Sequence, residues 1–199
     1  MARLTSLGLT NFKSIGGSQQ KIALSPITLL FGPNSAGKST VLQALIYLKE
    51  IVSKRNLNPD KTELGGNWLD LGGFQNLIHG RSLNTAIEFE VDIALDGDEL
   101  PDYLSDYEQS MLDEALFPAV ADFFSELKVA TLRFELRWSG SLSKVVIDRY
   151  ECLMNEKEVV SIQASSDARQ INIEAMPLLF EGLRAPIESF GDNASLVQL

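Results

Sequence analysis

Apolar positions over the first 55 residues predict two strands and a helix. Residues 4–12 carry spaced leucines and a phenylalanine that predict a strand, which resumes over 22–24 after Gly16–Gly17. The unbroken apolar run over 27–31 is rich in β-formers and predicts a short strand buried on both faces. Apolar residues over 41–52 cover more than one stripe of a helix, so we expect that helix to be mostly buried.

The middle of the chain is less regular. Residues 62–85 contain two Gly-Gly pairs and predict a loop with apolar anchors at Trp68 and Phe74, with His79 packing near Phe74. Residues 87–93 then alternate apolar with acidic side chains, which predicts a half-buried strand with an acidic outer face.

The last hundred residues combine helical and alternating patterns. Helix spacing extends over 102–127, with a second helix expected to start at Pro118, and a weak helix is predicted over 177–190. Alternation over 132–138 predicts a one-sided strand that is followed by a hairpin turn. Three further strands, forming a meander, are predicted over 144–153, 158–164 and 169–175.

Composition narrows the chemistry. The chain has 199 residues, one cysteine (Cys152) and one histidine (His79), which excludes an intrachain disulfide and zinc sites that need several cysteines or histidines. Its net charge is −10, so we expect no tight binding of DNA by this chain alone. No apolar run reaches the length of a membrane span and the N-terminus does not resemble a signal peptide, so a cytoplasmic location is expected.

One motif carries recognisable chemistry. Residues 32–40, GPNSAGKST, fit the P-loop pattern G-x-x-x-x-G-K-[ST] between a predicted strand and a predicted helix. Glycines let successive backbone N–H groups curl around phosphates, and the start of the helix directs its positive end toward the same anion. In this pattern Lys38 reaches the β- and γ-phosphates and the Ser39 hydroxyl binds Mg²⁺. The sequence therefore predicts that ATP and Mg²⁺ are bound, with these residues around the nucleotide: Gly32, Asn34, Ser35, Ala36, Gly37, Lys38, Ser39 and Thr40.

The same residues carry a family resemblance. NFKSI at 11–15 and PITLLFGPNSAGKSTVLQALIYL at 26–48 resemble the N-terminus of ABC-type ATPases of the RecF, OLD-nuclease and SMC kind. LDLGGFQNLIHG at 69–80 is similar to a subgroup of predicted bacterial AAA-family ATPases, several of which belong to phage-defence or DNA-repair systems. The resemblance covers about the first 95 residues.

The resemblance implies three further site residues. Lys13 and Ser14 resemble a pair that lies beside the nucleotide, and Gln75 resembles the Q-loop glutamine that approaches Mg²⁺ or the attacking water. An ordinary surface pair and a solvated loop amide are the alternatives. With Lys38, Gln75 is the expected catalytic residue, and with Ser39 it is an expected metal ligand.

Other parts of such an ATPase are missing from the sequence. Val145–Asp148 is similar to the start of a Walker B strand, but Arg149 stands where the catalytic glutamate is required, so we interpret it as an outer strand. Residues 71–75 are similar to the signature motif but lack its serine. We therefore expect an α/β fold: an ABC-ATPase-like N-terminal lobe with an antiparallel β-subdomain, a mixed core sheet around the P-loop helix, and no second α/β lobe.

The expected organisation has three parts. Residues 1–60 hold the first strands, the P-loop and its helix, 61–85 form a Q-loop-like connection, and 86–199 form the meander with helices. The resemblance implies an ATPase completed by a missing lobe or a second chain that supplies the signature motif and Walker B. It also implies head-to-head dimerisation and a nuclease or DNA-acting partner. The rivals are a nucleotide-sensing module without hydrolysis and, more weakly, a GTPase or kinase.

Overall fold

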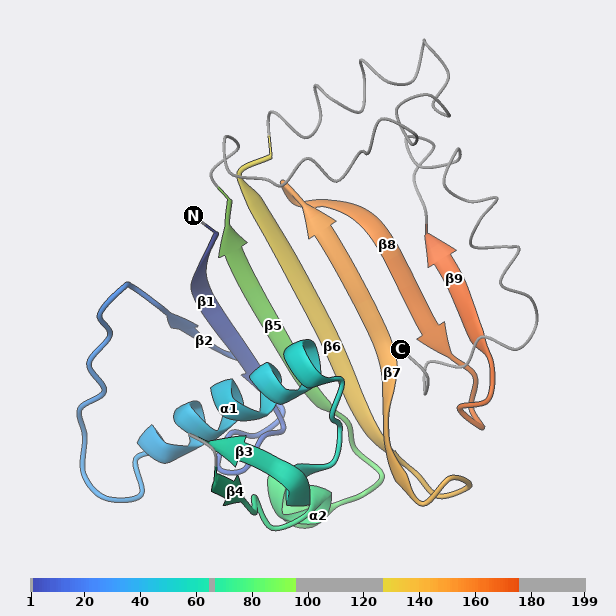
Figure 1. Cartoon of the computed structure of the whole chain (residues 1–199), viewed down its shortest axis with the longest axis horizontal. Helices are drawn as coiled ribbons and strands as arrows, with labels where there is room; N and C mark the ends of the chain where they lie inside the picture. The colour runs from blue at the N-terminus through green and yellow to red at the C-terminus, as the bar shows by residue number, and fades with distance from the viewer. Residues whose placement is uncertain (1, 65–66, 96–126, 176–199) are drawn as a thin grey trace.

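A computed structural model describes residues 2–64, 67–95 and 127–175 (Figure 1). Its main element is a sheet of seven strands in the order β2-β1-β5-β6-β7-β8-β9, in which every neighbouring pair is antiparallel. The predicted helices over 102–127 and 177–190 lie, apart from Leu127, outside the described residues. The strands are β1 (Arg3–Thr10), β2 (Gln20–Ala23), β5 (Ile87–Ala94), β6 (Val129–Ser139), β7 (Lys144–Met154), β8 (Lys157–Ala164) and β9 (Ile171–Ala175).

The alternating patterns predicted the sheet well. Ile87, Phe89 and Val91 of β5 are buried, whereas the acidic residues between them face the other side. On that side Lys21 of β2 contacts Glu90 and Asp92 at 2.9 and 2.8 Å. The meander of β6 to β9 is confirmed. The expected mixed core sheet is wrong for the described residues, because no parallel pair of strands occurs among them.

Helix α1 (Lys38–Lys54) lies across one face of this sheet and closes the core (Figure 1). Ala44, Tyr47 and Ile51 pack with residues of β1, β5, β6 and β7. Burial of the helix is less complete than its apolar pattern predicts, because Leu42 and Val52 are 54% and 57% exposed. One side of α1 rests on the sheet, and the short strand β3 (Thr62–Leu64) also lies beside the helix.

Residues 27–31 do not form the predicted buried strand. In Figure 1 they belong to the long blue loop between β2 and α1, which runs clear of the sheet. Ile27, Leu29 and Phe31 are 82%, 70% and 86% exposed. A strand needs a neighbour to pair its backbone, and no strand of the described ranges pairs with this segment.

The segment predicted as a loop over 62–85 contains short elements, which begin just before it. A 3₁₀ turn η1 (Pro59–Lys61) leads into a hairpin of β3 (Thr62–Leu64) and β4 (Asn67–Leu69), followed by α2 (Phe74–Leu77) and a second 3₁₀ turn η2 (His79–Arg81). The prediction missed them because none exceeds four residues, too short for a periodic pattern. Phe74 and Leu77 are buried in the main core, so this segment is fixed to the sheet.

Candidate nucleotide site

The P-loop motif forms a tight turn at the N-terminus of α1. Gly32 and Gly37 have φ angles of 149° and 89°, conformations that favour glycine. A Cβ at Gly32 would lie 3.1 Å from the Cβ of Ala36, so the turn also has little space for a side chain there. The spacing of the glycines in the sequence therefore matches the two places where the backbone requires them.

The start of α1 is open to an anion. Gly37 is its N-cap, no side chain caps the first turn, and the first turn contains no acidic residue. The first N–H groups of a helix have no partner within the helix and carry its positive partial charge. A bound phosphate would supply acceptors for these groups.

The Lys38 side chain folds over the loop. Its Nζ donates hydrogen bonds to the carbonyl oxygens of Gly32 and Pro33, both at 2.7 Å. These contacts hold the ammonium at the centre of the turn. A phosphate entering the turn would meet this charge directly.

The loop after β1 lies beside the P-loop. Lys13 and Ser14 line one cavity of about 360 Å³ together with six P-loop residues. The Ser14 Oγ lies 3.2 Å from the Oγ1 of Thr40 on α1, which joins the two segments. Partial burial lowers the pKa of the Lys13 ammonium. The P-loop residues that line the cavity are Asn34, Ser35, Gly37, Lys38, Ser39 and Thr40.

Two ammonium groups and four hydroxyls therefore border one cavity, and none of the residues that line it is acidic. Such a set suits a polyphosphate, because each charged donor forms a stronger hydrogen bond to an anion than a neutral one does. The cavity offers little to a metal ion: Ser39 supplies a hydroxyl, and no carboxylate completes a Mg²⁺ shell. The described residues contain no cluster of three His, Cys, Asp or Glu side chains that could hold a metal.

Other expected residues lie outside this cavity. Gln75 is exposed on α2 and does not line it, and Gly32 and Ala36 belong to the turn but not to the cavity wall. Asp148 lies in β7, where the Nε of Arg137 donates a hydrogen bond to its carboxylate. Asp148 is thus engaged within the meander, as predicted, but β7 pairs with β6 and β8 on its two sides, so it is not an outer strand of the sheet.

His79 makes a contact that the sequence did not predict. Its ring contacts the loop after β1, where its Nδ1 lies 2.8 Å from the carbonyl oxygen of Lys13. The two residues are 66 positions apart, and no local pattern in the sequence links them. The bridge between Phe12 and Ile78, with the backbone hydrogen bonds beside it, brings them together in the folded chain.

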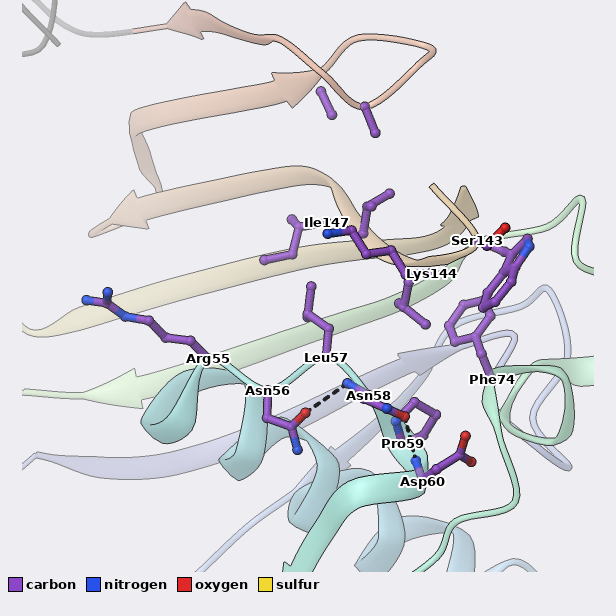
Figure 2. A pocket seen from close by; sticks show the side chains of 15 residues that line it. Arg55, Asn56, Leu57, Asn58, Pro59, Asp60, Phe74, Ser143, Lys144 and Ile147 are labelled. Atoms are coloured by element: carbon purple, nitrogen blue, oxygen red, sulfur yellow. Dashed lines mark hydrogen bonds between the residues drawn. The ribbon is translucent and has the colours of Figure 1, made fainter. Parts of the chain in front are cut away.

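A second cavity of about 430 Å³ lies at the other end of α1 (Figure 2). It is bordered by residues 55–60 and by apolar side chains of the β6–β7 hairpin. The Oδ1 atoms of Asn56 and Asn58 each accept a bond from the backbone N–H two residues ahead, both at 3.0 Å. Lys54, in the last turn of α1, contacts the buried Glu50 at 3.0 Å. Arg55 and Lys144 also line this cavity, as does Asp60, so its wall contains an acidic residue, unlike that of the P-loop cavity.

Comparison with known proteins agrees with the N-terminal motifs. Residues 6–66 match a family model described as AAA domain (AAA_23). Over 61 residues the chain is 33% identical to the chromosome partition protein Smc of Synechococcus sp.. That alignment covers 31% of this chain and 5% of the Smc protein, so the chain spans a small part of this relative's length.

A solved structure gives a weaker likeness over a longer stretch. It comes from work on ATP-driven dimerization and DNA-stimulated activation of SMC ATPases, and it shares 17% identity with a TM-score of 0.41. The match covers 78% of this chain and 71% of that one.

Within the described ranges, no helix has the length and apolarity needed to span a membrane. The AAA-domain match over 6–66 and the similarity to Smc thus agree with the resemblance to ABC-type ATPases that the motifs NFKSI and GPNSAGKST carry.

Proposed function

We propose that the chain binds ATP in the cavity between the P-loop and the loop after β1, as one lobe of an SMC-like ATPase. The observation that carries this proposal is the convergence of Lys38, Lys13 and the uncapped start of α1 on one cavity. Lys38 would bind the β- and γ-phosphates, Lys13 and Ser14 would lie beside them, and Ser39 would contribute its hydroxyl to Mg²⁺. Gln75 would have to approach from its exposed position on α2.

Hydrolysis requires groups that the cavity does not provide. A carboxylate must complete the Mg²⁺ shell and another must orient the attacking water. We infer that a second lobe, from the same protein or a separate chain, supplies them. The exposed apolar side chains of residues 27–31, and the exposed Leu42 and Val52 of α1, are consistent with such a lobe packing there.

A second part of the proposal concerns the process that ATP binding drives. A stretch of 61 residues of this chain is similar to Smc, and ATP-driven dimerization is named as a property of SMC ATPases. We propose that ATP closes two such heads and thereby switches a nuclease or DNA-acting partner, in phage defence or DNA repair. Tight binding of DNA to this chain itself is not expected, because its net charge of −10 repels phosphate backbones.

The rival function is nucleotide sensing without hydrolysis. The absence of acidic residues from the cavity lining favours it for this chain alone. Positioning a general base contributes about 10²- to 10⁴-fold in rate, so we expect phosphate release by the chain alone to be near background. Full activity on addition of the completing lobe would favour the ATPase, and continued inactivity would favour the sensor.

Replacement of Lys38 tests nucleotide binding. A hydrogen bond to a charged group contributes about 1.5–3 kcal/mol, so Lys38→Ala should lower the affinity for Mg·ATP at least about tenfold in a calorimetric titration. Lys49→Ala is the matched control, because Lys49 is exposed on the same helix and does not line the cavity. Equal affinities of wild type and Lys38→Ala would refute the P-loop assignment.

A further inference from the structure

The loop after β1 is held in place by the segment that contains α2 and η2. The backbone N–H of Lys13 donates to the carbonyl of Leu77 at 2.6 Å, and the N–H of His79 donates to the carbonyl of Asn11 at 2.8 Å. Between them, Phe12 and Ile78 form an isolated antiparallel bridge, and both side chains are buried. Residues 11–13 and 77–79 thus pair as two short antiparallel segments, with a backbone hydrogen bond on each side of the bridge.

His79 adds the one side-chain bond that reaches the Lys13 carbonyl. Its Nδ1 lies 2.8 Å from that oxygen, and because a carbonyl only accepts, Nδ1 carries the proton. The other edge of the ring faces Gly16, where a Cβ would lie 3.5 Å from Nε2. The ring therefore fits between the carbonyl it binds and a residue that leaves room for it.

The loop needs such support because its backbone is unfavourable. Asn11 and Lys13 have φ angles of 55° and 52°, in the left-handed region that residues with a Cβ rarely adopt. Such conformations persist where surrounding contacts over-determine them, often at functional sites. Lys13 is the strained residue whose carbonyl binds His79, and its side chain lines the cavity beside the P-loop.

We propose that His79 is a positioning residue for nucleotide binding, which acts by holding the Lys13 carbonyl so that the Lys13 side chain stays at the cavity. This inference rests on the proposed function, because it requires that the cavity binds a nucleotide. It also assigns a role to the segment 74–81, which joins the cavity to the sheet without lining it. His79 itself touches no bound phosphate in this scheme.

Two isosteric replacements separate this role from general stability. In His79→Asn the amide nitrogen occupies the place of Nδ1 and keeps the donor, whereas in His79→Gln the amide lies near the place of Nε2 and the donor is lost. A neutral hydrogen bond contributes enough to change an equilibrium by roughly 2- to 10-fold. We expect His79→Gln and His79→Ala to weaken Mg·ATP binding by about that factor, and His79→Asn to bind within about twofold of wild type.

A double variant tests whether the effect passes through Lys13. If it does, Lys13→Ala with His79→Ala should bind Mg·ATP no more weakly than Lys13→Ala alone, because interacting positions are not additive. Binding should be measured at a temperature where thermal unfolding shows every variant to be folded. Normal binding by His79→Ala, rescue by Gln rather than Asn, or full additivity would each overturn the inference. Failure of wild type to bind Mg·ATP would instead refute the proposed function, and this role with it.

Discussion

Two apolar segments near the N-terminus, β1 and residues 27–31, differ in how far they are buried. In β1, Leu7 and Leu9 are fully buried, because β2 and β5 pair with the strand on either side and α1 packs against the sheet. Residues 27–31 are at least as apolar in sequence, yet Ile27 and Phe31 are more than four-fifths exposed. An apolar pattern shows that a segment is suited to burial. Burial itself depends on neighbours that the segment does not encode.

The candidate site lies where these two regions meet. Lys13 and Ser14 belong to the packed region, because their loop is fastened to the core through Phe12. Lys38 and the P-loop follow the exposed segment directly. One wall of the cavity is therefore rigidly supported by the sheet, and the other leads to a surface that has no partner among the described residues.

The largest effect expected from this contrast is on stability. Phe89 is buried, with its ring centroid 5.5 Å from that of Phe12 and 6.2 Å from that of Tyr47. Phe89→Ala should therefore lower the free energy of unfolding by about 3–5 kcal/mol. Phe31→Ala, the same change on an exposed ring, should alter it by no more than about 0.5 kcal/mol.

Urea unfolding followed by circular dichroism measures both variants. Similar losses of unfolding free energy in the two variants would show that residues 27–31 are packed in solution. The two apolar segments would then not differ in burial. A negligible loss in Phe89→Ala would show instead that the core between α1 and the sheet is not formed.

Patterns in the sequence predicted those parts of the fold that depend on local rules. Alternation identified β5, because the core buries Ile87, Phe89 and Val91 and leaves the acidic residues between them on the other face. Glycine spacing and a following helix identified the P-loop, because phosphate binding requires that backbone. The predicted strand over 27–31 was wrong because pairing depends on distant residues. For the same reason no pattern could show that His79 contacts Lys13.

A smaller effect on stability is expected from the ion pairs of Lys21 with Glu90 and Asp92, on the face of the sheet opposite the core. Burial opposes ionisation of Asp92, but hydrogen bonds from Lys21, Ser6 and Thr131 outweigh it and lower the pKa of the carboxyl. Hydrogen bonds from Lys21 and Arg133 likewise outweigh burial and lower the pKa of Glu90. A lowered pKa in the folded protein stabilises it above the unfolded pKa of about 4, and this contribution disappears as the pH falls through the folded pKa.

Lys21→Met should therefore destabilise the protein at pH 7 and have less effect near pH 3. Lys21 is half exposed, so the difference should be below about 1 kcal/mol. Urea midpoints at the two pH values measure it, with Lys49→Met as a control for the loss of an exposed lysine. A Lys21→Met effect that is the same at both pH values would contradict the assigned ion pairs.

Hydrogen–deuterium exchange with and without Mg·ATP tests the central claim most directly, because it shows which segments the nucleotide contacts. We predict slower exchange in two separate stretches, 11–16 and 32–40, no change over β7, and weaker protection in Lys38→Ala at the same Mg·ATP concentration. Protection confined to 55–60 and the β6–β7 hairpin would place the nucleotide in the second cavity. That result, or unchanged exchange throughout the wild-type chain, would contradict the account.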